Sequence, residues 1–196
     1  MCLTGAFTHL PIHAAGKLSE GVSDYAVLSY TPTLGALLNA RRDLQPLRTT
    51  DARFLLAIVS KGFQWSHLPY AEEEKRAIEA VVPNYLNLSP SGDYEGTPRN
   101  GTTAQEVLAK LPEAAILHLA CHGHQNLQNP LESGFVMCDK MLTVEALMAL
   151  RPPRAFFAFL SACETAKGDE KQPDQAVHLA ATLLFAGFKS VIGTMW

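Results

Sequence analysis

Two short apolar runs of the sequence each end on a side chain that can do nucleophilic chemistry. Residues 116–123 read ILHLACHG and carry His122, and residues 155–165 read AFFAFLSACET and carry Cys163. A neighbouring imidazolium lowers the pKa of a thiol below its ordinary value of about 8.5, and the thiolate attacks a carbonyl carbon. If the two runs are adjacent parallel strands, His122 and Cys163 form such a pair at one edge of the sheet.

The spacing of strands in a sheet makes this pairing physically possible. Neighbouring strands lie about 4.8 Å apart, so side chains at the same level come within reach of each other. His122 would then protonate the amine that leaves when a peptide bond is cleaved. The backbone N–H groups of Gly123 and Cys163 would form an oxyanion hole, and Gly123 leaves room for the substrate carbonyl.

The remaining cysteines and the deeper histidine have simpler interpretations. Cys2, Cys121 and Cys138 are expected to be small buried hydrophobic side chains, as free cysteines usually are. Alternation along the first run directs Cys121 to the opposite strand face from His122. His118, on the same face as His122 but deeper, is expected to be a core histidine with a satisfied hydrogen bond.

A metal site on three imidazoles is an alternative. His118, His122 and His124 would alternate on one side of the strand if it continued, and three imidazoles suit zinc. Gly123 is expected to end the strand first, and the sequence has no CxxC or HExxH motif. It also lacks GxSxG and the glycine-rich phosphate-binding motifs. We therefore expect no metal and no cofactor.

Hydrophobic periodicity predicts strands that alternate with helices, which is typical of a mostly parallel sheet covered on both faces. Ligands of such sheets bind at the carboxyl ends of the strands, where His122 and Cys163 are expected. The predicted strands are 24–30, 53–59, 115–122, 155–162 and 190–196. The predicted helices are 34–42 with Thr33 as N-cap, 72–82, one running to 111 with a Thr102/Gln105 capping box, 144–150 with Thr143 as cap, and 175–185 with Asp174 as cap.

The composition is that of one globular unit. The chain has 196 residues, of which 47% are hydrophobic and 18% charged, enough for a single good-sized core. A net charge of −3 gives no electrostatic basis for binding nucleic acid or an anionic membrane. Four cysteines, no signal-peptide pattern and no bilayer-length apolar run indicate a reduced, cytoplasmic protein. Both ends read as interior domain sequence, so we expect a fragment of a longer chain.

Several motifs, in order along the chain, resemble the CHAT domain, a caspase-like domain often found behind tetratricopeptide repeats. They are ILHLACHG at 116–123, LSACETA at 160–166, VHLAATLLFAGFKSVIGTMW at 177–196, and shorter pieces at 10–16, 29–34, 68–74 and 130–134. The resemblance implies a single domain over 1–196, truncated at both ends. It also implies a caspase–haemoglobinase-like three-layer α/β/α fold with a His–Cys dyad of His122 and Cys163.

The resemblance favours one function and leaves a second open. It implies a cysteine endopeptidase of the caspase–separase type, with Cys163 as nucleophile and His122 as general acid and base. The substrate would be a protein or peptide, and a repeat domain would lie in the same longer chain. The alternative is a catalytically silent caspase-like module that serves as a signalling or scaffold surface.

Overall fold

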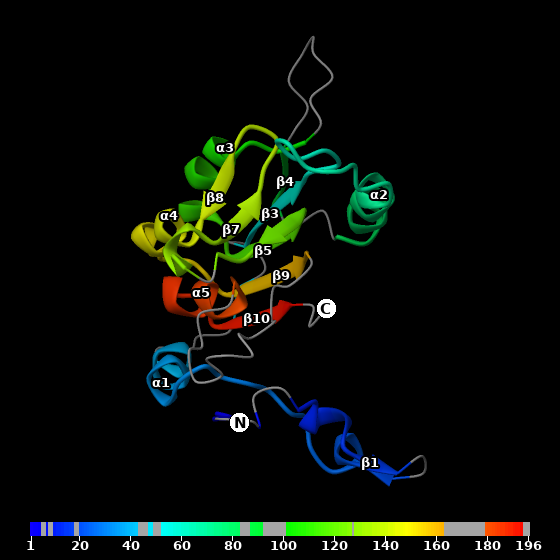
Figure 1. The fold of residues 1–196 in the computed structure, drawn as a ribbon, viewed down its shortest axis with the longest axis vertical. Helices are drawn as coiled ribbons and strands as arrows, with labels where there is room; N and C mark the ends of the chain where they lie inside the picture. Colours follow the sequence, from blue (N-terminus) through cyan, green and yellow to red (C-terminus); the bar gives the residue numbers. More distant parts are fainter. Residues whose placement is uncertain are drawn as a thin grey trace.

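Figure 1 presents the computed structural model of the chain. Residues 163–178 and 194–196 lie outside its described part, and with them the nucleophile candidate Cys163 and the predicted cap Asp174. Along 87–91 the description covers the backbone only. The structure describes residues 1–4, 7, 10–17, 20–42, 47–48, 52–82, 87–91, 101–126, 128–162 and 179–193.

A five-stranded parallel sheet forms the centre of the fold. Its strands stand in the order β10-β9-β5-β3-β4, and every neighbouring pair is parallel. They are β3 (Arg53–Ile58), β4 (Asn87–Ser91), β5 (Ile116–Ala120), β9 (Phe157–Ser161) and β10 (Ser190–Gly193). The strands predicted at 53–59, 155–162 and 190–196 are therefore confirmed in their described parts.

The side chains of β3 explain why both faces of the sheet are covered. Leu55 and Ala57 point to one face and belong to the larger core cluster, which also contains residues of α3 (Ala104–Lys110), α4 (Val144–Leu150) and α5 (Leu179–Ala186). Leu56 and Ile58 point to the other face and pack with Ala71, the first residue of α2 (Ala71–Val81). Because side chains alternate along a strand, an apolar run of this kind needs a helix layer on each side.

The helices form the two outer layers, with α2 on one face and α3, α4 and α5 on the other (Figure 1). The predicted three-layer α/β/α architecture is therefore confirmed. α4 begins at its predicted cap, Thr143. No helix in the described ranges is long and apolar enough to span a bilayer. The bounds are α2 (Ala71–Val81), α3 (Ala104–Lys110), α4 (Val144–Leu150) and α5 (Leu179–Ala186), with 3-10 turns η5 (Leu111–Glu113) and η6 (Pro130–Glu132).

The chain reverses its direction across the sheet after β4. Counted in chain order, the five strands stand as 2-1-3-4-5, so β4 lies on one side of β3 and all later strands lie on the other. At such a switch point the two crossovers diverge and leave a crevice outside the carboxyl ends of the strands. The topology therefore predicts a ligand-binding site at the carboxyl ends of β3 and β5.

A second, antiparallel sheet begins where β5 ends. Its strands are β6 (His122–His124), β7 (Gly134–Val136) and β8 (Met141–Thr143). The prediction of one strand over 115–122 that ends at Gly123 is wrong, because the chain bends at Cys121 and Gly123 lies inside β6. The physical reason is that β7 offers β6 a hydrogen-bonding partner in a new direction.

The described residues before β3 form short elements. The strand predicted at 24–30 is wrong: Tyr25 and Val27 are 74% and 102% exposed, and residues 26–30 have no regular structure. β-Branched and aromatic residues form a strand only where a partner and a half-buried face exist. α1 does begin at its predicted cap, Thr33. The elements are η2 (Ile12–Ala14), β1 (Gly16–Lys17), β2 (Glu20–Gly21), η3 (Val22–Asp24) and α1 (Leu34–Arg41).

The capping box of α3 lies one residue later than predicted. Thr103, not Thr102, is the N-cap, and Glu106, not Gln105, completes the box. Thr102 is fully buried, and its hydroxyl lies 3.2 Å from both the backbone nitrogen and the carbonyl oxygen of Ile58. A tertiary contact with β3 therefore occupies the threonine that the local motif would have used.

Gly134 offers a test of the small sheet that carries His122. A Cβ at this position would lie 2.2 Å from the carbonyl oxygen of Leu142 in β8, so Gly134→Ala must push β7 and β8 apart. We expect it to lower the free energy of unfolding by at least about 1–3 kcal/mol. Urea denaturation followed by circular dichroism measures this. The control, Gly35→Ala on the exposed side of α1, is expected to be neutral or to stabilise by up to about 1 kcal/mol.

Candidate active site

His122 is the first residue of β6, two positions after the end of β5. It is half-buried and pairs with Val136 of β7. Because β5 is parallel to β3, the segments that follow both strands emerge at the same edge of the sheet. His122 therefore lies at the carboxyl edge of the sheet, where the topology switches, next to residues 60–70, which follow β3.

A hydrogen bond to the main chain orients the His122 ring. Its Nε2 atom lies 3.0 Å from the carbonyl oxygen of Ser66 and 3.4 Å from the Ser66 hydroxyl. A carbonyl oxygen only accepts, so Nε2 carries the proton, and in the neutral ring the lone pair is on Nδ1. Nδ1 is then the atom that can take a proton from a thiol and pass it to a leaving amine.

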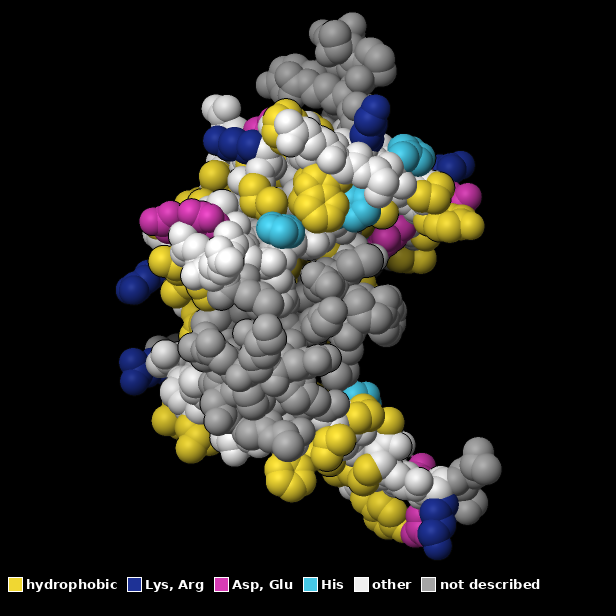
Figure 2. Space-filling view, viewed as in Figure 1, with side chains coloured by type: hydrophobic (Ala, Val, Ile, Leu, Met, Phe, Trp, Pro, Cys, Tyr) yellow, Lys and Arg dark blue, Asp and Glu magenta, His cyan; other side chains and the backbone are white. Residues whose placement is uncertain are grey.

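The indole of Trp65 packs against two histidines of β6. Its ring centroid lies 5.2 Å from that of His122 and 5.7 Å from that of His124. Since these histidines alternate with Gly123, they share one side of β6. Trp65 therefore limits rotation of the His122 ring. Trp65 itself is 36% exposed. Histidine and hydrophobic side chains lie close together on the upper part of the face seen in Figure 2.

Two backbone hydrogen bonds hold the segment 60–70 in place. The Phe63 N–H donates to the Met137 carbonyl at 3.0 Å, and the Leu68 N–H donates to the Ser60 carbonyl at 2.7 Å. The first bond attaches the segment to the chain just after β7, and the second closes the segment on itself. These bonds constrain the main chain on either side of Trp65 and Ser66, and the segment then continues into α2.

Three polar side chains are joined by hydrogen bonds on the α2 face of the sheet. The Nε2 atom of His118 lies 2.8 Å from one carboxylate oxygen of Glu74, and the Ser161 hydroxyl donates to the other at 3.0 Å. The ring of His118 also stacks on Phe159, with centroids 4.9 Å apart and planes 6° apart. His118 is only 7% exposed. The prediction of a core histidine with a satisfied hydrogen bond is confirmed.

Cys163 itself lies outside the described residues, so its place in the site stays a prediction. The strand that leads to it is described. Ser161, the last residue of β9, is in register with Ala120, the last residue of β5. Cys163 and His122 each stand two positions after this pair in the sequence.

The other cysteines differ from one another. Cys121 is buried in the larger core, and burial, with a smaller contribution from the charge of Glu74, raises the pKa of its thiol far above its ordinary value. Cys121 is therefore a neutral core side chain, as predicted. Cys138 is partly buried against the same core. Cys2 is exposed, so the expectation of burial is wrong for this residue, which lies before β3, outside the central sheet.

The three histidines of the zinc alternative have different partners. His118 bonds to Glu74, His122 bonds to Ser66, and His124 contacts Trp65. Within the described part of the chain, no group of three or more His, Cys, Asp or Glu side chains is arranged to hold a metal ion. The described geometry therefore gives the zinc alternative no support.

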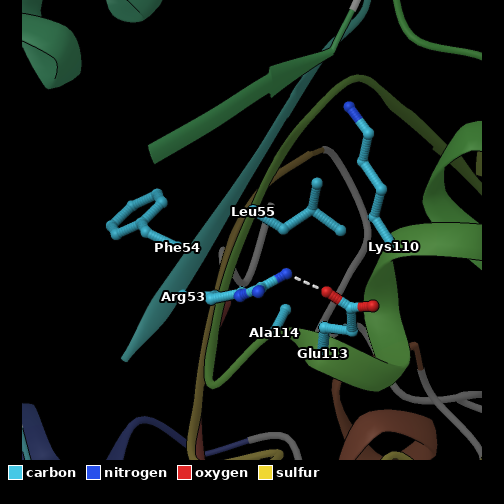
Figure 3. A pocket seen from close by; sticks show the side chains of 6 residues that line it. All are labelled: Arg53, Phe54, Leu55, Lys110, Glu113 and Ala114. Carbon is cyan, nitrogen blue, oxygen red and sulfur yellow. Dashed lines mark hydrogen bonds and ion pairs between the residues drawn. The ribbon is translucent and has the colours of Figure 1, made fainter. Parts of the chain in front are cut away.

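Two surface hollows lie away from His122. The first, of about 180 Å³, is at the amino ends of β3 and β5, and Figure 3 shows Arg53 and Glu113 paired across it. The second, of about 340 Å³, lies between α1 and α5. The described residues that line the two hollows include no His, Cys or Ser, so neither hollow has a Cys/His or Ser/His pair for nucleophilic catalysis. The first hollow is lined by Arg53, Phe54, Leu55, Lys110, Glu113 and Ala114.

Trp65, Ser66 and Glu74 were not predicted from the sequence to be members of the site. A usable signal was present, because the run at 53–59 was predicted to be a parallel strand and ligand-binding residues follow the carboxyl ends of such strands. The residues after it belong to the same edge of the sheet as His122. That Ser66 acts through its carbonyl could not have been predicted, since every residue has one.

The orientation of His122 can be tested by its tautomer. In a Cys163→Ala variant above pH 8 we expect the neutral ring to carry its proton on Nε2. The reason is the Ser66 carbonyl at 3.0 Å, which accepts only from a protonated nitrogen. Ring ¹⁵N chemical shifts report which nitrogen is protonated, and a further His122→Gln change assigns the signal. A proton on Nδ1 instead would contradict the hydrogen bond.

Comparison with known proteins gives one finding and one absence. No curated protein matches the chain. The family model described as the CHAT domain matches residues 1–196, the whole chain. The α/β/α architecture, with a parallel sheet between helix layers, agrees with a caspase-like fold. The chain therefore belongs to the CHAT domain family, a caspase-like family.

Proposed function

We propose that this domain is a cysteine endopeptidase that cleaves protein or peptide substrates with a dyad of His122 and Cys163. Membership of a caspase-like family supports a peptidase-like function. The observation that carries the proposal is the orientation of His122, whose Nε2 is bonded to the Ser66 carbonyl at the switch-point edge. A histidine held in this way keeps Nδ1 for proton transfer.

The register of β5 and β9 supports Cys163 as the partner of this histidine. Ala120 and Ser161 are paired neighbours, and the two candidate residues follow them at equal distance along the chain. The buried, neutral thiol of Cys121 is not a competing nucleophile. Cys163 also follows the Ser161 that Glu74 holds from the α2 side.

The proposed reaction has two stages. The Cys163 thiolate attacks the scissile carbonyl carbon, and protonated His122 gives its Nδ1 proton to the amine as the C–N bond breaks. A water molecule, deprotonated by the now neutral imidazole, then hydrolyses the thioester and releases the carboxylate product. The negative oxygen of each tetrahedral intermediate is proposed to accept from the N–H groups of Gly123 and Cys163.

Two further properties stay predictions of the same proposal. A repeat domain is expected in the same longer chain, where it would present the substrate to the site. The protein is expected to be cytoplasmic, where a reduced Cys163 thiol would persist.

The dyad is tested by cleavage of a proteome-derived peptide library, read by mass spectrometry. Cys163→Ala is expected to abolish cleavage, because the nucleophile is lost. His122→Ala is expected to lower the rate by about 10²- to 10⁴-fold, the usual contribution of a general acid–base residue. Cys138→Ala is the matched control and should cleave like the wild type. Equal cleavage by the Cys163→Ala variant would contradict the proposal.

Thiol reactivity separates the peptidase from the catalytically silent alternative. At pH 7 we expect iodoacetamide to label Cys163 at least about tenfold faster than Cys138, because an imidazolium stabilises the thiolate. His122→Ala should remove this difference. Labelling of Cys163 no faster than Cys138 in the wild type would favour a silent signalling or scaffold module.

A further inference from the structure

One carboxylate joins three elements behind His122. Glu74, in the first turn of α2, accepts from His118 of β5 and from Ser161 of β9, one residue on each oxygen. Both donors lie on the α2 face of the sheet, and His118 is nearly buried. The carboxylate therefore bridges the two strands that lead to His122 and Cys163.

α2 has little apolar anchoring of its own. Ala71 is its single buried residue, and Ile78 is only partly buried. The apolar cluster on this face is small compared with the core on the opposite face. Since hydrophobic stabilisation scales with the apolar area buried, packing holds α2 only weakly. The charge-assisted hydrogen bonds of Glu74 are stronger than neutral ones and directional, so they fix where the first turn of α2 lies.

The first turn of α2 is directly continuous with the segment that contacts His122. The Glu74 N–H donates to the Tyr70 carbonyl at 2.9 Å, so Glu74 closes the first turn. The segment 60–70 runs into that turn without an intervening linker. Ser66 and Trp65, both in contact with His122, lie in this segment. A shift of α2 would therefore move the carbonyl that orients the histidine ring.

We infer that Glu74 is a positioning residue. It fixes the position of the segment that orients His122 relative to β9, the strand that precedes Cys163 in the sequence. This inference rests on the proposed function, since the two residues it aligns are the proposed dyad. Glu74 contacts neither the substrate carbonyl nor His122 in this role. Its contribution is to the geometry of proton transfer, so it should affect kcat more than KM.

Hydrogen-bond chemistry distinguishes two substitutions at this site. Glu74→Ala leaves the His118 N–H and the Ser161 hydroxyl without their acceptor. Glu74→Gln keeps the shape, and its amide oxygen can accept from His118 while its NH₂ group donates to the Ser161 oxygen, because a hydroxyl also accepts. Comparison of the two variants therefore distinguishes the effect of losing the hydrogen bonds from the effect of losing the negative charge. Glu73→Ala, on the exposed side of the same turn, is the matched control.

The kinetic test uses a peptide that the wild-type chain cleaves in the library screen. We expect Glu74→Ala to lower kcat by about 10- to 100-fold with little change in KM, the effect of a small misplacement of catalytic groups. Glu74→Gln should restore most of kcat, and Glu73→Ala should equal the wild type. Ser161→Ala, which removes one arm of the bridge, should fall between. Normal kcat in a folded Glu74→Ala variant would overturn the inference and leave the proposed function intact.

A spectroscopic test does not depend on cleavage. In the Cys163→Ala background, ring ¹⁵N and ¹H signals of His122 should shift or broaden in Glu74→Ala and stay in place in Glu73→Ala. Thermal denaturation of each variant confirms that the folded state is being compared. Unchanged His122 signals in folded Glu74→Ala would overturn the inference. If the wild type cleaves nothing while these signals move as expected, the proposed function fails and the bridge stands.

Discussion

The pairing of β5 with β3 on one side and β9 on the other determines the geometry of the whole site. Backbone hydrogen bonds in a parallel sheet set the relative height of its strands, and here Ala120 is level with Ser161 on one side and Ile58 on the other. Three chain segments consequently emerge at one edge, where the topology also reverses. The residues that contact the His122 ring, Trp65 and Ser66, come from the segment after β3, far from it in sequence.

The two faces of this sheet are stabilised by different interactions. The face under α3, α4 and α5 is apolar and carries the larger core, including the neutral thiol of Cys121. The face under α2 buries less apolar area and contains His118, Glu74 and Ser161 in mutual hydrogen bonds. A buried polar side chain such as His118 destabilises the fold unless it is paired. This face therefore combines a smaller apolar cluster with directional hydrogen bonds close to the site.

Local pattern predicted much of the fold because many elements satisfy local rules. The buried run of β3, the Thr33 and Thr143 caps and the helix α2 follow from apolar spacing and short-range hydrogen bonds. The failures share one cause, which is that the outcome depends on partners distant in sequence. Thr102 bonds to Ile58 and leaves the cap to Thr103, and the run at 24–30 lacks a strand to pair with in the described residues.

The sequence by itself determined the α/β class, the CHAT family and the choice of His122, because residue types and their order along the chain carry that information. Only the tertiary structure decided how His122 is oriented. The chain bends at Cys121 into a second sheet, and the Ser66 carbonyl and the Trp65 indole meet the ring from another strand's end. Backbone carbonyls carry no sequence signal, and a through-space contact exists only once the strands are side by side.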